Sequence, residues 1–577
     1  MKGIAASGGI AIGKAFVLTR EDIRVSQEKI SHEAVPTEQK KLATAIEKTR
    51  RQLLLLKEKT QAQLSEKEAG VFDAHIMFLD DPEYIGGARE AIEQELIGAA
   101  YAVKSVTDAF VNEFRGIEDA YFKERAADVA DVGERIMRNI LGLSGTDLSA
   151  LEPGSIVVAH DLTPSDTALL DKNKVLGFAA DVGGKTSHAA IMARSLMIPA
   201  VLGLTDITQK VRTGDSIIID GSTGIVIHEP DLAAIEEYRD KKEAYEKELA
   251  ELFTLKDAEA ITKDGCRVEL FANIGTTADV DGALKYGAQG IGLFRTEFLY
   301  MDAKEMPGED IQFEAYKQVL EKMQGRPVII RTLDIGGDKK LPYLPTDDEM
   351  NPFLGLRAIR LCFKEIEMFK TQLRAILRAS VFGKALIMFP MIATVTEVRQ
   401  AKAILNECKQ ELSEKGIAFD PDVKAGIMVE VPSAAVSADT IAKEVDFFSI
   451  GTNDLCQYTL AVDRMNGNVS YLYDHFDPAV LRLIKMVIDA SHNEGIFTGM
   501  CGEMAGDERA AALLLGLGLD EFSMSAASVL RVKKAVRNTA MQQAKQLAKE
   551  ALTLESAEEV KALIKAGMEA QYGTAND

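Results

Sequence analysis

The C-terminal half of the chain repeats one hydrophobic pattern eight times: a short apolar run, a polar loop, and a helix-favouring stretch. The apolar runs are residues 270–274, 290–294, 328–330, 385–390, 426–429, 447–450, 498–500 and 521–524. Short apolar runs that alternate with helical segments are typical of buried parallel strands. Eight such units predict a closed TIM (β/α)8 barrel, which we place at residues 261–577.

The N-terminal part of the chain predicts an α/β domain interrupted by helices. Residues 1–20 and 145–230 contain short β-rich runs around one helix that begins near His188. Residues 21–144 instead follow a helical period, in which Phe72, His75 and Leu79 share one face. We therefore expect a multidomain α/β protein whose first domain carries an inserted helical bundle, used for packing or for docking a partner.

The segment that joins the two halves is highly charged and contains neither glycine nor proline between Asp231 and Leu255. At 1.5 Å per residue, a helix of this length spans roughly 35 Å. We predict a semi-rigid helical linker over residues 231–260.

Composition narrows the class of protein. The 577 residues include 89 acidic and 67 basic side chains, a net charge of −22, which argues against a nucleic-acid partner. No apolar run is long enough for membrane insertion, and the first residues lack the pattern of a signal peptide. Five scattered cysteines without a C-x-x-C pair predict neither disulfides nor a zinc site. We expect a cytoplasmic protein.

The most informative local motif is GGKTSH, residues 183–188. A strand-like run enters a glycine turn, Thr186 or Ser187 supplies an N-cap, and His188 falls in the first helical turn. Free backbone N–H groups and the helix dipole favour an anion there and oppose protonation of the imidazole. Such a histidine can attack phosphorus and carry the phosphoryl group. An isolated histidine at this position can equally cap the helix or pack, so the interpretation depends on the rest of the chain.

Polar side chains of complementary chemistry follow the predicted barrel strands, and the active sites of TIM barrels lie at these strand ends. Arginines recognise phosphate and carboxylate oxygens, and two carboxylates without His or Cys ligands suit Mg²⁺. The implied ligand is a small phosphorylated carboxylate. The residues are Arg295, Arg331, Glu430, Asn453, Asp454 and Cys501, with Arg357 and Arg464 in nearby loops or helix starts.

Cys501 is the unusual member of this set. Without a base or a second sulfur in sequence reach, a nucleophilic thiol is poorly supported, whereas a protonated thiol can donate H⁺ to an enolate. The alternative is a small buried apolar residue.

With both halves taken together, the chain resembles, essentially end to end, the Enzyme I family of the bacterial phosphoenolpyruvate:sugar phosphotransferase system. The matching motifs are GGKTSHAAIMARSLMIP (183–199), KERAAD (123–128), FRTEF (294–298), RTLDIGGD (331–338), NPFLGLRAIR (351–360), DFFSIGTNDLCQYTLAVDR (446–464) and GMCGEMAGD (499–507).

The resemblance implies a role for each candidate residue. His188 matches the phosphohistidine, Cys501 the proton donor, and Glu430 and Asp454 the Mg²⁺ ligands. Thr167 matches a residue that orients the histidine, and Arg357 is a supporting arginine near the mouth. The residues implied to contact phosphoenolpyruvate are Arg295, Arg331, Asn453, Asp454 and Arg464.

The implied activity is transfer of the phosphoryl group of phosphoenolpyruvate to the protein's own histidine and then to the histidine of the phosphocarrier protein HPr, with release of pyruvate. This is the first step of sugar uptake. The family also implies that the helical bundle docks HPr and that the barrel forms a homodimer. Because the barrel and the bundle lie at opposite ends of the chain's layout, we expect the α/β domain to swivel between them.

Three other kinds of protein could share parts of this sequence pattern. The related dikinases and synthases share the histidine and barrel but need a nucleotide-binding domain, and residues 1–180 contain no credible motif for one. A nitrogen-regulating paralogue carries an additional sensor domain, also absent. The third alternative is not an enzyme: a catalytically silent scaffold that binds a partner through its helical bundle. A phosphotransfer assay would distinguish it, because the scaffold would show no activity.

Overall fold

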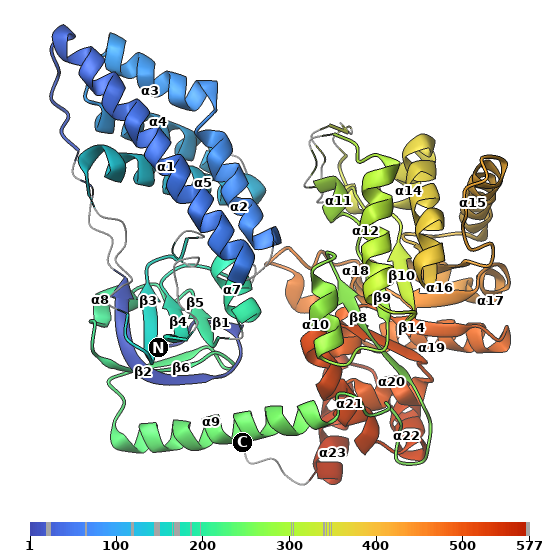
Figure 1. Cartoon of the computed structure of the whole chain (residues 1–577). Coiled ribbons are helices and arrows are strands. Elements are labelled where there is room, and N and C mark those ends of the chain that lie inside the picture. Colours follow the sequence, from blue (N-terminus) through green and yellow to red (C-terminus); the bar gives the residue numbers. More distant parts are fainter. Residues whose placement is uncertain are drawn as a thin grey trace. The chain divides into compact units, whose positions relative to one another are not determined.

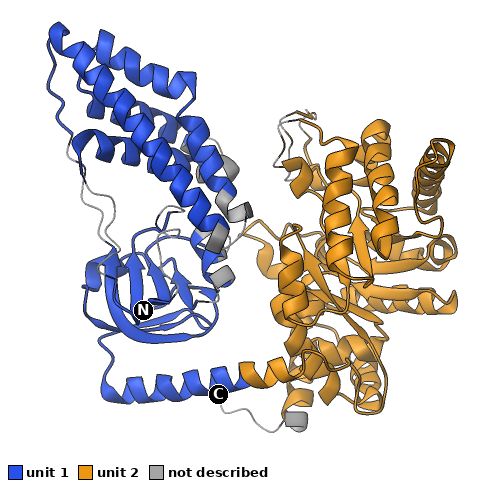
Figure 2. Cartoon of the chain, in the orientation of Figure 1, with its two compact units in different colours: residues 1–248 blue, residues 249–577 orange. Residues whose placement is uncertain are grey.

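The structure, a computed structural model, forms two compact units, residues 1–248 and 249–577 (Figures 1 and 2). It describes residues 1–18, 23, 25–63, 66–116, 120–143, 151–163, 166, 173–184, 187–196, 198–301, 303, 305–337, 341, 343–344, 347 and 349–572. No helix within these residues has the length and apolarity needed to cross a membrane.

The first unit is built on a seven-stranded sheet in the order β1-β5-β4-β3-β2-β6-β7. The strands are β1 (Ile4–Ser7), β2 (Ile10–Leu18), β3 (Ser155–Ala159), β4 (Val175–Ala180), β5 (Ala200–Leu202), β6 (Ser216–Asp220) and β7 (Ile225–His228). Strands β2 to β5 are parallel, and apolar clusters cover both faces. The α/β domain is confirmed, although β5 was not predicted.

In the part of the chain that the structure describes, the helices α1 to α5 lie between β2 and β3 in the sequence and form a bundle with its own apolar core (Figure 1). Phe72, His75 and Leu79 are buried in it, as their helical spacing predicts. The bundle helices are α1 (Val35–Gln63), α2 (Glu66–Phe78), α3 (Pro82–Gln94), α4 (Ala99–Gly116) and α5 (Ala120–Leu141). Two shorter helices, α7 (His188–Leu196) and α8 (Ile207–Lys210), follow β4 and β5.

Within the linker predicted over residues 231–260, α9 (Leu232–Thr254) is one continuous helix, and residues 255–260 form turns and irregular backbone. It crosses the boundary between the two units at residue 248 (Figure 2). The absence of glycine and proline explains why no break occurs along its length.

The second unit is a closed eight-stranded parallel barrel in the order β10-β11-β12-β13-β14-β15-β8-β9. The predicted TIM barrel is therefore confirmed, with every strand within two residues of its expected bounds. The strands are β8 (Glu269–Ile274), β9 (Ile291–Phe294), β10 (Val328–Arg331), β11 (Ala385–Phe389), β12 (Lys424–Val429), β13 (Phe447–Ile450), β14 (Phe497–Met500) and β15 (Glu521–Met524).

Helices surround this barrel (Figure 1). They are α10 (Asp279–Lys285), α11 (Phe298–Met301), α12 (Glu309–Lys322), α13 (Ile359–Lys364), α14 (Ile366–Ala379), α15 (Val395–Glu414), α16 (Pro432–Val436), α17 (Ala438–Ile441), α18 (Thr452–Leu460), α19 (Pro478–Asn493), α20 (Ala511–Leu517), α21 (Val529–Asn538), α22 (Met541–Ala551) and α23 (Ala557–Tyr572). A small apolar cluster that includes Met388, Met428 and Phe447 fills the barrel interior below the loops.

Candidate active site

The first candidate site is the start of α7 in the α/β domain. Gly183 has φ +112°, a left-handed conformation that favours glycine, and it turns the chain after β4. Ser187 Oγ accepts a hydrogen bond from the Ala190 N–H at 3.4 Å, so the predicted N-cap is confirmed and α7 begins at His188. The His188 side chain and all of Thr167 lie outside the described residues.

The second candidate site is the mouth of the barrel, where two buried arginines share one carboxylate. Arg331, the last residue of β10, lies 2.5 Å from Glu297 Oε1 and 3.0 Å from Asp334 Oδ2. Arg357 contacts the same Asp334 at 3.0 Å and reaches Asp454 Oδ2 at 3.2 Å. Ion pairs within this low-dielectric mouth hold the guanidinium planes in fixed orientations.

The loop that carries Arg357 fits closely against the loop after β10. A Cβ on Gly336 would lie 2.5 Å from Arg357 Cβ, so a side chain at position 336 would displace the arginine. The Ala358 N–H also donates to the Ile335 carbonyl at 2.9 Å. Ala358 has φ +51°, an uncommon conformation for alanine that the surrounding contacts hold in place.

Glu430 and Asp454 bring two further buried carboxylates to the mouth. Glu430, directly after β12, accepts the Met391 N–H at 2.7 Å. Burial raises the pKa of Glu430 above its ordinary value, and the neighbouring Asp454 and Asp334 carboxylates raise it further. Among the described residues, Asp454 Oδ1 has no hydrogen-bond partner. Both carboxyl groups therefore lie where a cation would stabilise their charged forms.

Cys501 follows β14 and is 4% exposed. Its Sγ lies 3.9 Å from the Ile450 carbonyl oxygen, to which it donates. Burial raises the pKa of the Cys501 thiol to about 11, although the nearby Ser449 hydroxyl and the Arg331 charge oppose that rise. The thiol is therefore protonated at neutral pH, as a proton donor requires.

The remaining predicted residues lie on the surrounding loops. Arg295 follows β9 and is exposed, and Arg464 is half-buried in the loop after α18, where its backbone N–H donates to Gln457 Oε1 at 3.2 Å. Asn453 lies in the first turn of α18, where its Oδ1 accepts the Glu503 N–H at 3.1 Å. The structure thus gathers Arg331, Arg357, Glu430, Asp454 and Cys501 in the buried mouth and places Arg295, Asn453 and Arg464 around it.

Sequence reasoning did not single out the two carboxylates that orient Arg331. Glu297 and Asp334 belong to the motifs FRTEF and RTLDIGGD, each a few residues beyond a strand-end arginine. An acidic residue a few positions after a strand-end arginine could have identified both carboxylates from the sequence. Both side chains are buried here, at 5% and 4% exposure.

We expect replacement of Arg357 by leucine to destabilise the barrel by about 3–5 kcal/mol, because Asp334 and Asp454 would lose a buried cationic partner. Differential scanning calorimetry of the full chain measures the effect. Arg399→Ala is the matched control: it breaks an exposed pair with Glu444, which is worth about 1 kcal/mol or less. Equal losses in the two variants would contradict the buried network.

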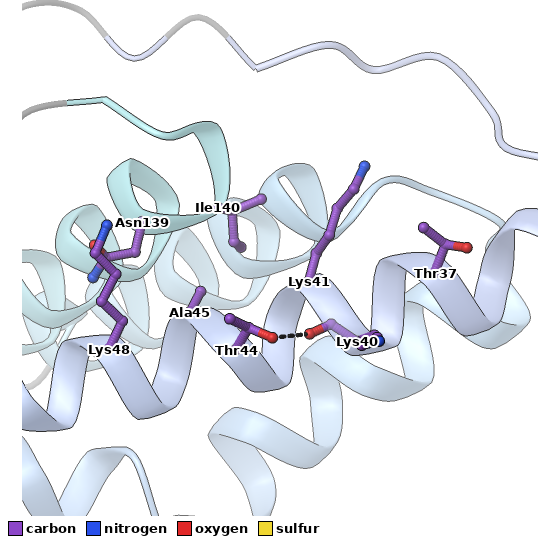
Figure 3. A pocket seen from close by; sticks show the side chains of 8 residues that line it. All are labelled: Thr37, Lys40, Lys41, Thr44, Ala45, Lys48, Asn139 and Ile140. Atoms are coloured by element: carbon purple, nitrogen blue, oxygen red, sulfur yellow. Dashed lines mark hydrogen bonds between the residues drawn. The ribbon is translucent and has the colours of Figure 1, made fainter.

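A cavity of about 350 Å³ lies elsewhere, between α1 and α5 of the bundle (Figure 3). Three ammonium groups make its lining basic, and Lys41 is held by Glu38 at 2.6 Å. None of the lining residues is a histidine or an acid, so the cavity lacks the groups needed for phosphoryl transfer. They are Thr37, Lys40, Lys41, Thr44, Ala45, Lys48, Asn139 and Ile140.

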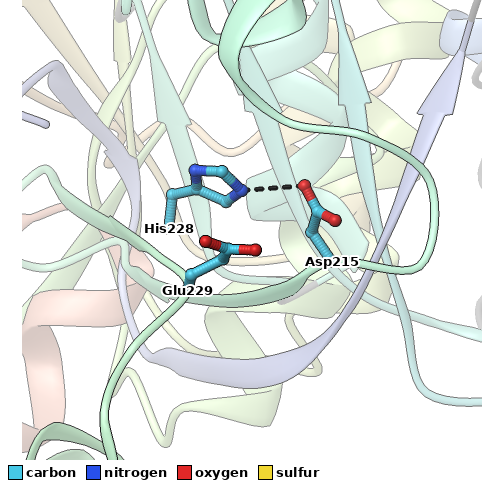
Figure 4. A group of neighbouring side chains, drawn as sticks. All are labelled: Asp215, His228 and Glu229. Atoms are coloured by element: carbon cyan, nitrogen blue, oxygen red, sulfur yellow. Dashed lines mark hydrogen bonds and ion pairs between the residues drawn. The ribbon is translucent and has the colours of Figure 1, made fainter.

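Figure 4 shows a cluster of Asp215, His228 and Glu229 at the ends of β6 and β7. His228 Nε2 lies 2.8 Å from Asp215 Oδ2, and the same carboxylate oxygen accepts the Arg212 N–H. These contacts identify a hydrogen-bonded pair that ties two strands together.

Comparison with known proteins places these features in a family. Three family models match: "PEP-utilising enzyme, N-terminal" over residues 2–125, "PEP-utilising enzyme, mobile domain" over 151–224, and "PEP-utilising enzyme, PEP-binding domain" over 249–541. The last of these contains the whole barrel mouth, and the mobile-domain match contains His188.

Full-length relatives give the same result. The phosphoenolpyruvate-protein phosphotransferases of Staphylococcus carnosus and Listeria monocytogenes are each 51% identical to this chain, and each alignment covers 98% of both proteins. A solution structure of Enzyme I (nEIt) is 48% identical, covers 43% of this chain and 99% of its own, and has a TM-score of 0.39. The chain therefore belongs to the family of phosphoenolpyruvate-protein phosphotransferases, the Enzyme I family of PEP-utilising enzymes.

Proposed function

We propose that the chain transfers the phosphoryl group of phosphoenolpyruvate to His188 and then to the histidine of HPr, releasing pyruvate, as the first step of phosphotransferase-system sugar uptake. One observation carries this proposal: the barrel mouth combines two buried arginines, two carboxylates suited to a cation and a protonated thiol. These groups match a small phosphorylated carboxylate and the enolate that forms when it loses its phosphoryl group.

Each residue has a defined task in this reaction. Arg331, with Arg295 and Arg464, binds the phosphate and carboxylate oxygens and neutralises charge as phosphorus leaves the enol oxygen. Asn453 orients the substrate by hydrogen bonding. A ring nitrogen of His188 attacks phosphorus in line, while Thr167 orients the ring. Cys501 then gives its thiol proton to C3 of the enolate, which forms pyruvate.

The donor set fits Mg²⁺. Glu297, Asp334, Glu430 and Asp454 face Arg331 and Arg357, so four carboxylates against two guanidiniums leave two negative charges when all are ionised. The unpartnered Asp454 Oδ1 and the Glu430 carboxyl would hold the ion, since Mg²⁺ prefers oxygen ligands. The bound ion would supply positive charge for phosphate oxygens and keep both carboxylates ionised.

The helical bundle is the proposed docking surface for HPr. Leu55 on α1 and Met77 on α2 are 66% and 52% exposed, and large exposed apolar side chains support a protein-binding role. The α/β domain must carry His188 from the barrel mouth to the carrier, which agrees with the "mobile domain" description of residues 151–224. We also propose a homodimer that forms through the barrel. The exposed apolar side chains of Met465, Tyr471 and Leu472 support this proposal.

A coupled assay tests the proposal. With Mg²⁺, phosphoenolpyruvate and HPr, we expect one pyruvate for each phospho-HPr formed, because the same phosphoryl group passes through His188. Pyruvate is measured with lactate dehydrogenase, and phospho-HPr by native gel. We expect EDTA to stop both products and excess Mg²⁺ to restore them. Pyruvate released without phospho-HPr, or activity insensitive to EDTA, would contradict the proposal.

A further inference from the structure

Gln372 is a buried amide side chain with no task in the reaction described above. It lies on α14, which packs beside α12 on the outside of the barrel (Figure 1). The side chain is 0% exposed. A buried amide is costly unless its oxygen and its N–H groups have partners, so the partners of Gln372 indicate what the residue holds in place.

The Gln372 amide joins the two loops that follow β9 and β10. Its Oε1 accepts the Leu333 N–H at 2.9 Å, and its Nε2 donates to Thr296 Oγ1 at 3.0 Å and to the Tyr316 hydroxyl at 3.1 Å. Thr296 Oγ1 in turn donates to the Arg331 carbonyl oxygen at 2.9 Å. Since a backbone N–H can only donate, Leu333 fixes which end of the amide is the oxygen.

Each loop residue that the amide bonds is followed by a carboxylate that orients Arg331. Glu297 directly follows Thr296, and Asp334 directly follows Leu333. The two carboxylates hold separate nitrogens of the guanidinium, Nη2 at 2.5 Å and Nη1 at 3.0 Å. One side chain on α14 therefore fixes the backbone next to both carboxylates.

A second buried amide supports this link from the helix side. Gln312 on α12 is also 0% exposed, and its Oε1 accepts the hydroxyls of Tyr316 and Tyr300, each at 3.1 Å. Its Nε2 donates to the Pro307 carbonyl oxygen at 3.0 Å. Burial raises the pKa of Tyr316, so its hydroxyl keeps the proton that it donates. None of the bonds of Gln312 is made to the residues that precede the two carboxylates.

We propose that Gln372 is a positioning residue that sets the orientation of Arg331 toward phosphoenolpyruvate. The inference rests on the proposed function, because it requires Arg331 to bind the substrate. The amide sets the spacing between the loops after β9 and β10, and this spacing sets the plane in which the two carboxylates hold the guanidinium. Gln372 is fully buried and fully bonded, so it acts only through these loops.

The charges at the mouth explain why Arg331 needs this support. The anionic oxygens of a bound substrate compete with Glu297 and Asp334 for one guanidinium, so loops that were free to move would let the arginine turn with the substrate. Among the described residues, Arg331 Nε is buried and has no hydrogen-bond partner. With both carboxylates held in place, that N–H remains available for a substrate oxygen.

Gln372→Met tests the positioning role, because methionine has a similar volume but replaces none of these hydrogen bonds. Pyruvate formation by the full chain is measured with Mg²⁺, excess HPr and a range of phosphoenolpyruvate concentrations. We expect kcat/KM to fall by about 10²-fold, the effect of displacing a positioned group by about 1 Å, with KM clearly raised. Gln312→Met is the matched control: it removes the other buried amide and should lower Tm in calorimetry as Gln372→Met does, but keep the wild-type KM.

The value of KM distinguishes positioning from a merely structural role, because partial unfolding lowers the amount of active enzyme without changing KM. Thr296→Val decides the question if Gln372→Met does not fold: it removes the hydroxyl between the amide and the Arg331 carbonyl and should raise KM, whereas Thr296→Ser should restore it. A wild-type KM in Gln372→Met, or an equally raised KM in Gln312→Met, would overturn the inference. A wild-type chain that forms no pyruvate would instead refute the proposed function, and the inference with it.

Discussion

Replacement of His188 by glutamine is expected to abolish labelling of the chain by ³²P-phosphoenolpyruvate. Glutamine can follow Ser187 in the first turn of α7 without disturbing the N-cap, but its amide is not a nucleophile toward phosphorus. The loss of label should therefore be complete. A variant with only a weakened affinity for substrate would still be labelled at a high concentration of phosphoenolpyruvate. Acid-labile, base-stable label on the intact chain is the measurement.

A second histidine of the same domain provides the matched control. His228 lies in β7 and is held by Asp215 at 2.8 Å, so His228→Gln removes a histidine from the same sheet without touching α7 (Figure 4). This variant should label as fully as the wild type. Label that persists in His188→Gln, or that disappears from His228→Gln, would show that the phosphoryl group is carried elsewhere.

Replacement of Cys501 by alanine is expected to lower kcat for pyruvate formation by about 10²–10⁴-fold, the usual contribution of a positioned acid. KM for phosphoenolpyruvate should change little, because the arginines that we propose to bind the substrate remain. The sign of the pH dependence follows from burial, which raises the pKa of the thiol to about 11. A donor with that pKa loses its proton only as the pH rises toward 11, so the wild-type rate should show no fall from this group between pH 7 and 9.

Cys408→Ala is the control for the cysteine experiment, because Cys408 is equally buried but lies on α15, outside the barrel. It should leave kcat unchanged. A Cys501→Ala variant with wild-type turnover would refute the donor role, and the proton would then have to reach the enolate from water.

Much of the architecture could be predicted because the relevant signals are local. Each barrel strand is a short apolar run between polar segments, and α9 lacks every helix-breaking residue. The strand β5 escaped prediction because three apolar residues after Pro199 look like the end of α7 followed by a loop. Only its pairing with β1 and β4 makes Ala200–Leu202 a strand, and such pairing is a long-range property.

The site was predictable only in part, for a related reason. Arg331, Glu430 and Cys501 are each the residue at or just after a strand's end, so counting along the sequence finds them. The partners of Arg331 could not be found this way, because the geometry of two loops brings Glu297 and Asp334 to it.

The connection between β2 and β3 has a consequence for how the helical bundle can be removed. The two strands are parallel neighbours, with Lys14 opposite Ser155 and Leu18 opposite Ala159. The chain therefore leaves the C-terminal end of β2 and must return to the opposite end of the sheet to enter β3. A return of this kind needs a dozen or more residues, which the bundle now supplies. A shortened protein joined by a tight turn would have to reverse one strand, and only a bridging loop could replace the helical bundle while leaving the sheet intact.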